Sequence, residues 1–181
     1  GLATKAVEHF GRIDVMVNNA GVMPLAFYAD HADASAKWSQ CIDINIKGVL
    51  HGIISVYDQM MAQEEGHVIN ISSIYGNFPV AGAGVYGASK AAVNFLSESL
   101  RVEARGKIKV TTVKPTGVPA TGLSAGIVNP EAVIGIVGQN QPEFQSTMQS
   151  IADGQVDPKV VNQDSIGCAV LEPDYIADQV I

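Results

Sequence analysis

Residues 66–90, GHVINISSIYGNFPVAGAGVYGASK, decide the fold of this chain. The stretch begins with a short apolar run, HVINIS at 67–72, which is typical of a strand buried on both faces of a sheet. A glycine-rich loop at 76–84 follows, and the pattern from Tyr86 to about Ala104 predicts a helix. A buried strand that leads through a loop into a helix is a building block of a parallel sheet.

The same alternation continues on both sides of this stretch. Upstream, residues 2–10 have a helical pattern that stops at Gly11, and IDVMV at 13–17 predicts a second buried strand. Downstream, KIKVTTV at 107–113 predicts a third strand. Apolar strands that alternate with helices of crossover length predict an α/β fold with a doubly wound parallel sheet, which is Rossmann-like.

A long helical pattern lies between the first two strands, over residues 36–61. Its apolar residues fall on two stripes at helical spacing. One stripe contains Trp38, Ile42, Ile46, Val49, Ile53, Val56 and Met60, and the other contains Cys41, Ile44, Leu50, Ile54, Tyr57 and Met61. Such a helix is either enclosed within one fold or shared with another subunit, and we expect it to be shared.

The sequence at the two ends of the chain indicates a domain that is truncated at both its N-terminal and its C-terminal side. The first residues, GLATKAVEHFG, resemble the second half of a helix, and the last ten, EPDYIADQVI, resemble a helix that has just begun. We therefore expect residues 1–181 to be a single partial Rossmann-like domain. Within it, residues 119–165 form a long connection without strong periodicity, which is typical of a substrate lid. Alone, such a chain is expected to be inactive and prone to aggregation, because its first strand lacks neighbours.

Composition excludes several other classes of protein. The net charge of −7 argues against nucleic-acid binding, and the scattered Lys and Arg residues offer no polybasic membrane signal. No apolar run approaches the ~18 residues of a transmembrane helix. The two cysteines form no CxxC pair and the four histidines lack ligand spacing, so no metal site is expected. These features favour a protein of a reducing compartment such as the cytoplasm.

The strand ends carry the residues from which chemistry is expected, because ligands of such sheets bind at the carboxyl ends of the strands. Tyr86 and Lys90 are four residues apart at the start of a helix and therefore share one face. Ser73 lies at a strand end, 13 residues before Tyr86, and the loop between them can bring the two hydroxyls together. Asn45 and the turn at 18–21 (NNAG) add two independent features.

Taken in order and spacing, five motifs resemble those of the short-chain dehydrogenase/reductase family. They are NNAG at 18–21, DINIKG at 43–48, INISS at 69–73, YGASK at 86–90 and VKPTGV at 113–118. The resemblance covers residues 1–118 closely and residues 119–181 by general layout. It implies four catalytic residues. Tyr86 would be the general acid/base, Ser73 would orient the substrate oxygen, and Asn45 would hold a water in a proton relay that passes through Lys90.

The pKa of the phenol is central to that implied mechanism. A free tyrosine has a pKa of ~10, which is too high for an efficient base near neutrality. The Lys90 ammonium, together with a positively charged nicotinamide, is expected to favour the phenolate and to lower the pKa of Tyr86. In the family the lysine also holds the nicotinamide ribose.

The resemblance also implies a cofactor, NADP or NAD, with NADP slightly favoured. It places eight residues against that cofactor: Asn19, Ala20, Gly21, Tyr86, Lys90, Pro115, Thr116 and Val118. Asn18 would instead tie neighbouring strands together. Two departures from the family pattern stand out. Thr116 replaces a usual glycine, and the 181 residues contain no Gly-x-x-x-Gly-x-Gly phosphate turn before the first strand.

The function predicted on these grounds is hydride transfer between a nicotinamide cofactor and a small carbonyl compound or secondary alcohol, of partly hydrophobic character. Two alternatives stay open. One is a non-catalytic binding or scaffold subunit of the same fold, and the other is a nucleotide-sugar epimerase or dehydratase that uses the same tyrosine and lysine. The resemblance further implies a homodimer or homotetramer that assembles through helices 36–61 and 86–104.

Overall fold

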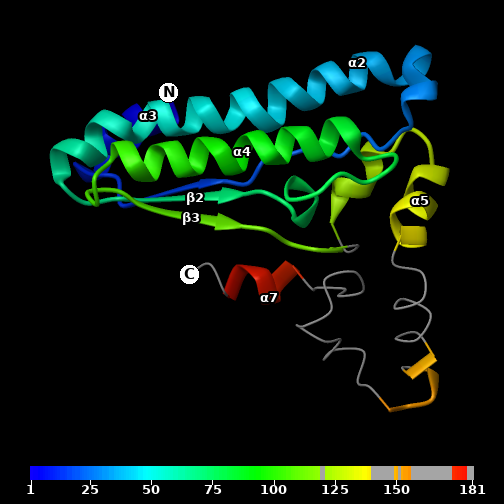
Figure 1. The fold of residues 1–181 in the computed structure, drawn as a ribbon. Coiled ribbons are helices and arrows are strands. Elements are labelled where there is room, and N and C mark those ends of the chain that lie inside the picture. The colour runs from blue at the N-terminus through cyan, green and yellow to red at the C-terminus, as the bar shows by residue number, and fades with distance from the viewer. Residues whose placement is uncertain (119–120, 140–148, 151, 156–172, 179–181) are drawn as a thin grey trace.

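The computed structural model of this chain describes residues 1–118, 121–139, 149–150, 152–155 and 173–178. Its centre is a parallel sheet of β1 (Val15–Asn18), β2 (His67–Ile71) and β3 (Lys109–Val113), in that spatial order. Val15 pairs with His67, and His67 pairs with Lys109. Two long helices lie together along one face of the sheet, as Figure 1 shows. The predicted α/β fold with a parallel sheet is therefore confirmed.

The helix predicted at 36–61 is longer and less regular than expected. The structure has α2 (His31–Ile42), a π-helical segment (Asp43–Lys47) and α3 (Gly48–Gln63) in direct succession. A 3-10 turn (Tyr28–Asp30) precedes α2, so helical structure begins before residue 36. A π-helical turn widens the backbone, and such turns often occur at functional sites. Asn45 lies at its centre.

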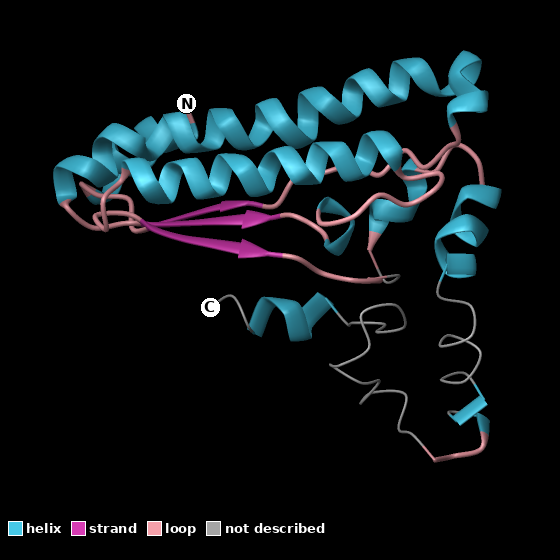
Figure 2. Cartoon of the chain, in the orientation of Figure 1, coloured by secondary structure: helices cyan, strands magenta, loops and turns pink. Residues whose placement is uncertain are grey.

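The remaining helices in the described residues are α1 (Leu2–Phe10), α4 (Gly84–Glu103), α5 (Glu131–Gln139) and α7 (Pro173–Asp178), and short 3-10 segments cover Ile74–Gly76 and Gly122–Gly126. Of these helices, α1, α4 and α7 agree with the sequence pattern, whereas α5 lies in the segment 119–165, for which no helix was predicted. Figure 2 shows how helices and strands alternate along the chain. Much of the predicted lid at 119–165, namely 119–120, 140–148, 151 and 156–165, lies outside the described residues. Among the residues that the structure describes, no helix is both long enough and apolar enough to cross a membrane.

The main core lies between the sheet and the pair α3 and α4. It contains Val56 and Met60 of α3, Val68 of β2, and Val93 and Leu100 of α4, all nearly inaccessible to solvent. Each such side chain contributes about 1.5–3 kcal/mol through removal of its apolar surface from water. The apolar stripes read in the sequence therefore fix these two helices against the sheet.

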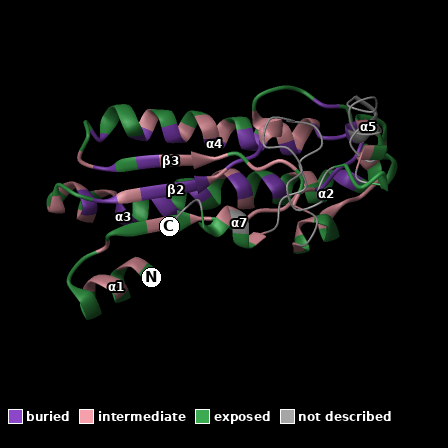
Figure 3. Cartoon of the chain, turned by 90° about the horizontal axis from the view of Figure 1, so that it is seen from below, coloured by how far each residue is buried: buried purple, intermediate pink, exposed green. Residues whose placement is uncertain are grey.

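The expectation that the strand at 13–17 is buried on both faces is wrong for this chain. Met16 packs on the core beneath α3, but Val15 and Val17 are 52% and 49% exposed. Alternation along a strand places these two valines on the opposite face, and β1 has a strand neighbour on one side only among the described strands. β2 lies between two strands and is buried as predicted, which Figure 3 shows as a mostly purple middle strand.

A chain of buried polar side chains ties the sheet to the helices. Asn18 Nδ2 donates to Asn70 Oδ1 (2.8 Å), Asn70 Nδ2 donates to Ser97 Oγ (2.8 Å), and Ser97 Oγ donates to the Val93 carbonyl (2.8 Å). Asn18 thus links β1 to β2, as the family resemblance implied. Its side chain also touches Gly52 of α3, where an added Cβ would lie 1.9 Å from Asn18 Oδ1.

We predict that Gly52→Ala destabilises the protein by about 1–3 kcal/mol, because the new methyl group displaces Asn18 and leaves the buried Asn70 amide without its partner. Gly48→Ala is the matched control. It lies one turn earlier, no atom lies within 4 Å of its added Cβ, and the alanine favours the helix by up to about 1 kcal/mol. Urea unfolding of the two variants measures the difference. Equal stabilities would contradict the close contact between α3 and Asn18.

Candidate active site

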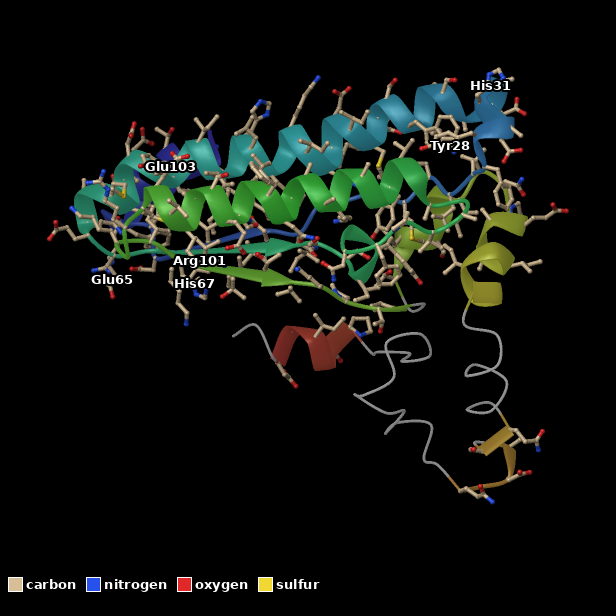
Figure 4. The ribbon with its side chains drawn as sticks, in the orientation of Figure 1. Tyr28, His31, Glu65, His67, Arg101 and Glu103 are labelled. Atoms are coloured by element: carbon tan, nitrogen blue, oxygen red, sulfur yellow. The ribbon has the colours of Figure 1, made fainter. Side chains whose placement is uncertain are left out.

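A cavity of about 450 Å³ opens where the carboxyl ends of the three strands meet. Residues 19–21 reach it from β1, Ser73 reaches it from β2, and residues 115–118 reach it from β3. In Figure 4, His67 and Glu65 mark the opposite, amino end of the sheet. Every residue predicted to contact a cofactor lines this cavity: Asn19, Ala20, Gly21, Tyr86, Lys90, Pro115, Thr116 and Val118.

Tyr86 lies in the first turn of α4 and is only 3% exposed. Burial raises the pKa of Tyr86 to about 12, because it penalises the phenolate, and a hydrogen bond with the Ser73 side chain acts in the opposite direction. The sequence led us to expect a lowered pKa. In this chain the pKa of Tyr86 is raised instead, because the Lys90 amine does not offset the loss of solvent around the phenol.

Lys90 lies one turn after Tyr86 and is buried as well, at 4% exposed. Its Nζ donates to the main-chain carbonyl of Ile71 at the end of β2 (2.8 Å) and lies 5.9 Å from the centroid of the Tyr86 ring. Burial lowers the pKa of Lys90 to about 8. An added Cβ on Gly21 would lie 3.4 Å from this Nζ, so a glycine lets the turn after β1 come close to the amine.

The two serines that follow β2 make different bonds. Ser73 Oγ accepts from the backbone N–H of Tyr75 (3.3 Å) and also interacts with the Tyr86 phenol. Ser72 Oγ donates to the main-chain carbonyl of Lys90 (3.0 Å) and so ties α4 to the sheet. Both serines line the cavity, but Ser73 is the one that bonds to the tyrosine, in agreement with the predicted spacing.

Asn45 lies behind the cavity rather than in its wall. Its side chain is 1% exposed, and its Oδ1 accepts from the Val22 N–H (2.9 Å) while its Nδ2 lies within reach of the Val22 carbonyl (3.0 Å). The same Nδ2 also approaches Ser89 Oγ (2.9 Å) and Cys41 Sγ (3.2 Å). The side-chain amide is therefore committed to protein partners. Its Oδ1 accepts one hydrogen bond here and can accept a second, so the expectation that Asn45 holds a water of the proton relay stays a prediction.

Several cavity residues were not singled out from the sequence, and Leu123, Pro173 and Ile176 are among them. Leu123 belongs to the segment after β3, and Pro173 and Ile176 belong to α7, about fifty residues later. The apolar character of residues 119–137 was a signal for Leu123. No local pattern marks Pro173 or Ile176, because only tertiary folding brings α7 to the carboxyl end of the sheet.

The cavity suits the nicotinamide and ribose portion of a dinucleotide. Its volume falls within the ~300–1,000 Å³ usual for ligand pockets, and the Lys90 amine offers a donor to ribose hydroxyls at its wall. The glycine at position 21 leaves room beside that amine. The phosphate-binding turn that would hold the remainder of a dinucleotide is not among the 181 residues.

Comparison with known proteins establishes the family. The chain matches the family model described as short chain dehydrogenase over residues 1–132, and so it belongs to the short-chain dehydrogenase family. An uncharacterised oxidoreductase of Staphylococcus saprophyticus is 34% identical to it over 173 residues, or 96% of this chain and 65% of the relative. The chain thus spans less than two thirds of that relative's length.

Two solved structures of the family are also similar to the chain. A metagenomic short-chain oxidoreductase in complex with NADP is 36% identical, with a TM-score of 0.58 over 65% of this chain and 54% of that one. A short-chain dehydrogenase/reductase from Burkholderia phymatum in complex with NAD is 34% identical, with a TM-score of 0.63 over 69% of this chain and 45% of that one. The Rossmann-like fold class predicted from the sequence is confirmed.

The lowered pKa of Lys90 predicts how stability depends on pH. Between pH 8 and 10.5 the unfolded chain still binds the lysine proton that the folded chain has released, so stability rises with pH over this window. The rise attributable to Lys90 is at most about 3 kcal/mol. Urea unfolding of the wild type and of Lys90→Met measures this contribution. We predict that the unfolding free energy of the wild type, relative to that of Lys90→Met, increases by up to about 3 kcal/mol between pH 7 and pH 10.5. A difference that stays flat across the window would contradict burial of the amine.

Proposed function

We propose that this chain is the catalytic part of an NAD(P)-dependent oxidoreductase that interconverts a small carbonyl compound and a secondary alcohol. One observation carries the proposal: Ser73, Tyr86 and Lys90 converge on a single cavity at the carboxyl end of the sheet, between residues 19–21 and residues 115–118. A non-catalytic scaffold would not require this convergence. Among the described residues that line the cavity, no feature favours a nucleotide-sugar epimerase or dehydratase.

The three side chains have distinct roles in this proposal. A bound nicotinamide supplies or accepts the hydride. Ser73 donates a hydrogen bond to the substrate oxygen, and Tyr86 gives that oxygen its proton during reduction and takes it back during oxidation. Because burial keeps Tyr86 a neutral phenol near pH 7, the resting side chain is ready to act as the acid of carbonyl reduction. Lys90 holds the ribose hydroxyls beside the phenol.

The cofactor and substrate follow from the walls of the cavity and from the relatives. The cofactor is NADP or NAD, since one similar structure binds each. Leu123, Pro173 and Ile176 give the cavity an apolar wall, which supports a substrate with an apolar substituent beside its carbonyl group. We also propose a cytoplasmic location, because the two cysteines lie far apart in the sequence and suggest no disulfide framework.

Tyr86→Phe is expected to remove more than nine tenths of the turnover and to leave cofactor affinity nearly unchanged. The variant keeps the ring but loses the proton, and positioned acid/base catalysis contributes ~10²–10⁴ in rate. Steady-state kinetics and cofactor titration of the whole protein measure the two effects. Tyr57→Phe, on α3 away from the cavity, is the matched control and should keep its rate. A Tyr86→Phe variant with more than about a tenth of the wild-type rate would rule out Tyr86 as the acid/base.

We also propose that the protein is a homodimer or homotetramer assembled through α3 and α4. On these helices Leu50, Ile54 and Phe95 are 38%, 62% and 76% exposed, and a groove of about 310 Å³ runs between the two helices. Large apolar side chains exposed along a groove are typical of an interface. The exposed α3 residues Leu50 and Ile54 belong to the second apolar stripe of the sequence and find no place in the core.

The assembly is tested by light scattering of the whole protein after size-exclusion chromatography. The wild type should elute as a dimer or tetramer, and Ile54→Glu should shift it toward the monomer, because a carboxylate in an apolar interface loses its water. Ile134→Glu changes an equally exposed residue, 69% accessible on α5, and should leave the assembly intact. A wild-type protein that runs as a clean monomer would refute the proposal.

A further inference from the structure

Ser89, which the proposed mechanism does not use, has a fully committed hydroxyl beside the site. The residue is 1% exposed. Its Oγ accepts from Asn45 Nδ2 (2.9 Å) and from the Cys41 thiol (3.6 Å), and it donates to the main-chain carbonyl of Tyr86 (2.7 Å). One donated and two accepted bonds use the whole capacity of a hydroxyl.

These bonds form a continuous path from the turn after β1 to the helix that carries Tyr86. The path starts at the main chain of Val22, whose N–H and carbonyl both bond to the Asn45 side chain. It crosses from Asn45 to Ser89 over 44 positions of sequence and ends on the Tyr86 carbonyl. Asn45 is therefore linked through Ser89 to the main chain of Tyr86.

The first turn of α4 needs such an anchor. The helix begins at Gly84 after Ala83, and the alanine supplies no side-chain cap for the first N–H groups. The residues before it include Gly82 in a left-handed conformation (φ +80°). Tyr86 is the third residue of this helix, and a shift of its turn would move the phenol away from Ser73.

A serine in a helix often donates to a carbonyl three or four residues earlier, with only local consequences. Ser97 on the same helix provides the comparison. It is fully buried, accepts from Asn70 Nδ2 (2.8 Å) and donates to the Val93 carbonyl (2.8 Å), so it makes the same kind of bond pair as Ser89. Ser97 lies eleven residues after Tyr86 on α4, and its hydrogen bonds lead to Asn70 and Asn18 in the sheet.

We infer that Ser89 is a positioning residue, which holds the first turn of α4 against Asn45 so that the Tyr86 phenol stays beside Ser73 and Lys90. The inference rests on the proposed function, because the phenol must be placed for proton transfer. Small displacements of a reacting group are costly, since an error of about 1 Å can reduce a rate by ~10². Ser89 thus affects the rate without touching the substrate.

The test compares Ser89→Ala with Ser97→Ala in the whole protein. Ser89→Ala loses one donated and two accepted bonds, and Ser97→Ala loses one of each on the same helix, so both variants should lower the melting temperature. Only Ser89→Ala should reduce kcat, by about tenfold or more, with each KM within about threefold of the wild type. Its pH profile of kcat should also shift, by about half a unit or more, because the surroundings of Tyr86 change.

A second pair of variants separates the hydroxyl from changes in packing. Ser89→Thr and Ser89→Val have nearly the same shape, but only threonine keeps the hydroxyl, so the valine variant should have a kcat about tenfold below that of the threonine variant. Equal kcat in this pair, or a Ser89→Ala variant with the kcat and pH profile of Ser97→Ala, overturns the inference. Tyr86→Phe, measured alongside, distinguishes the two proposals. An active Tyr86→Phe variant refutes the proposed function. An inactive Tyr86→Phe variant together with a fully active Ser89→Ala variant refutes only the positioning role of Ser89.

Discussion

Two hydrogen bonds hold Lys90 against the end of β2, and the geometry of the site depends on them. The Lys90 ammonium donates to the Ile71 carbonyl (2.8 Å), and the Lys90 carbonyl accepts from Ser72 Oγ (3.0 Å). The side chain and the main chain of one residue are thus both fixed to the same strand end. Since Tyr86 precedes Lys90 by one helical turn and Ser73 follows Ser72 directly, these bonds also set the distance between the phenol and the serine hydroxyl.

Burial at this junction moves both titratable groups toward their neutral forms. The pKa of Tyr86 rises to about 12 and the pKa of Lys90 falls to about 8, and in each case loss of solvent is the largest cause. Near neutrality the site therefore offers a phenol that can donate its proton, beside an amine that is still protonated. A base formed from Tyr86 would need additional positive charge nearby, which an oxidised nicotinamide carries.

Much of this arrangement could be predicted from the sequence, because it depends on short spacings. The spacing of four between Tyr86 and Lys90 is about one helical turn, and apolar runs that end in polar residues mark the carboxyl ends of strands. What could not be predicted depends on tertiary contacts. The π-helical turn that carries Asn45 and the approach of α7 have no local signature. The direction of the Tyr86 pKa was missed because sequence reveals a charged neighbour but not the depth of burial.

The central claim is that the three strand ends form one nicotinamide site around Tyr86. A crystal structure of the whole protein with a bound nicotinamide dinucleotide tests it most directly. We predict that the nicotinamide ring lies between Tyr86 and residues 115–118, with the Lys90 amine bonded to the ribose hydroxyls. A dinucleotide bound away from this cavity, or a Tyr86 phenol turned away from the ring, would contradict it.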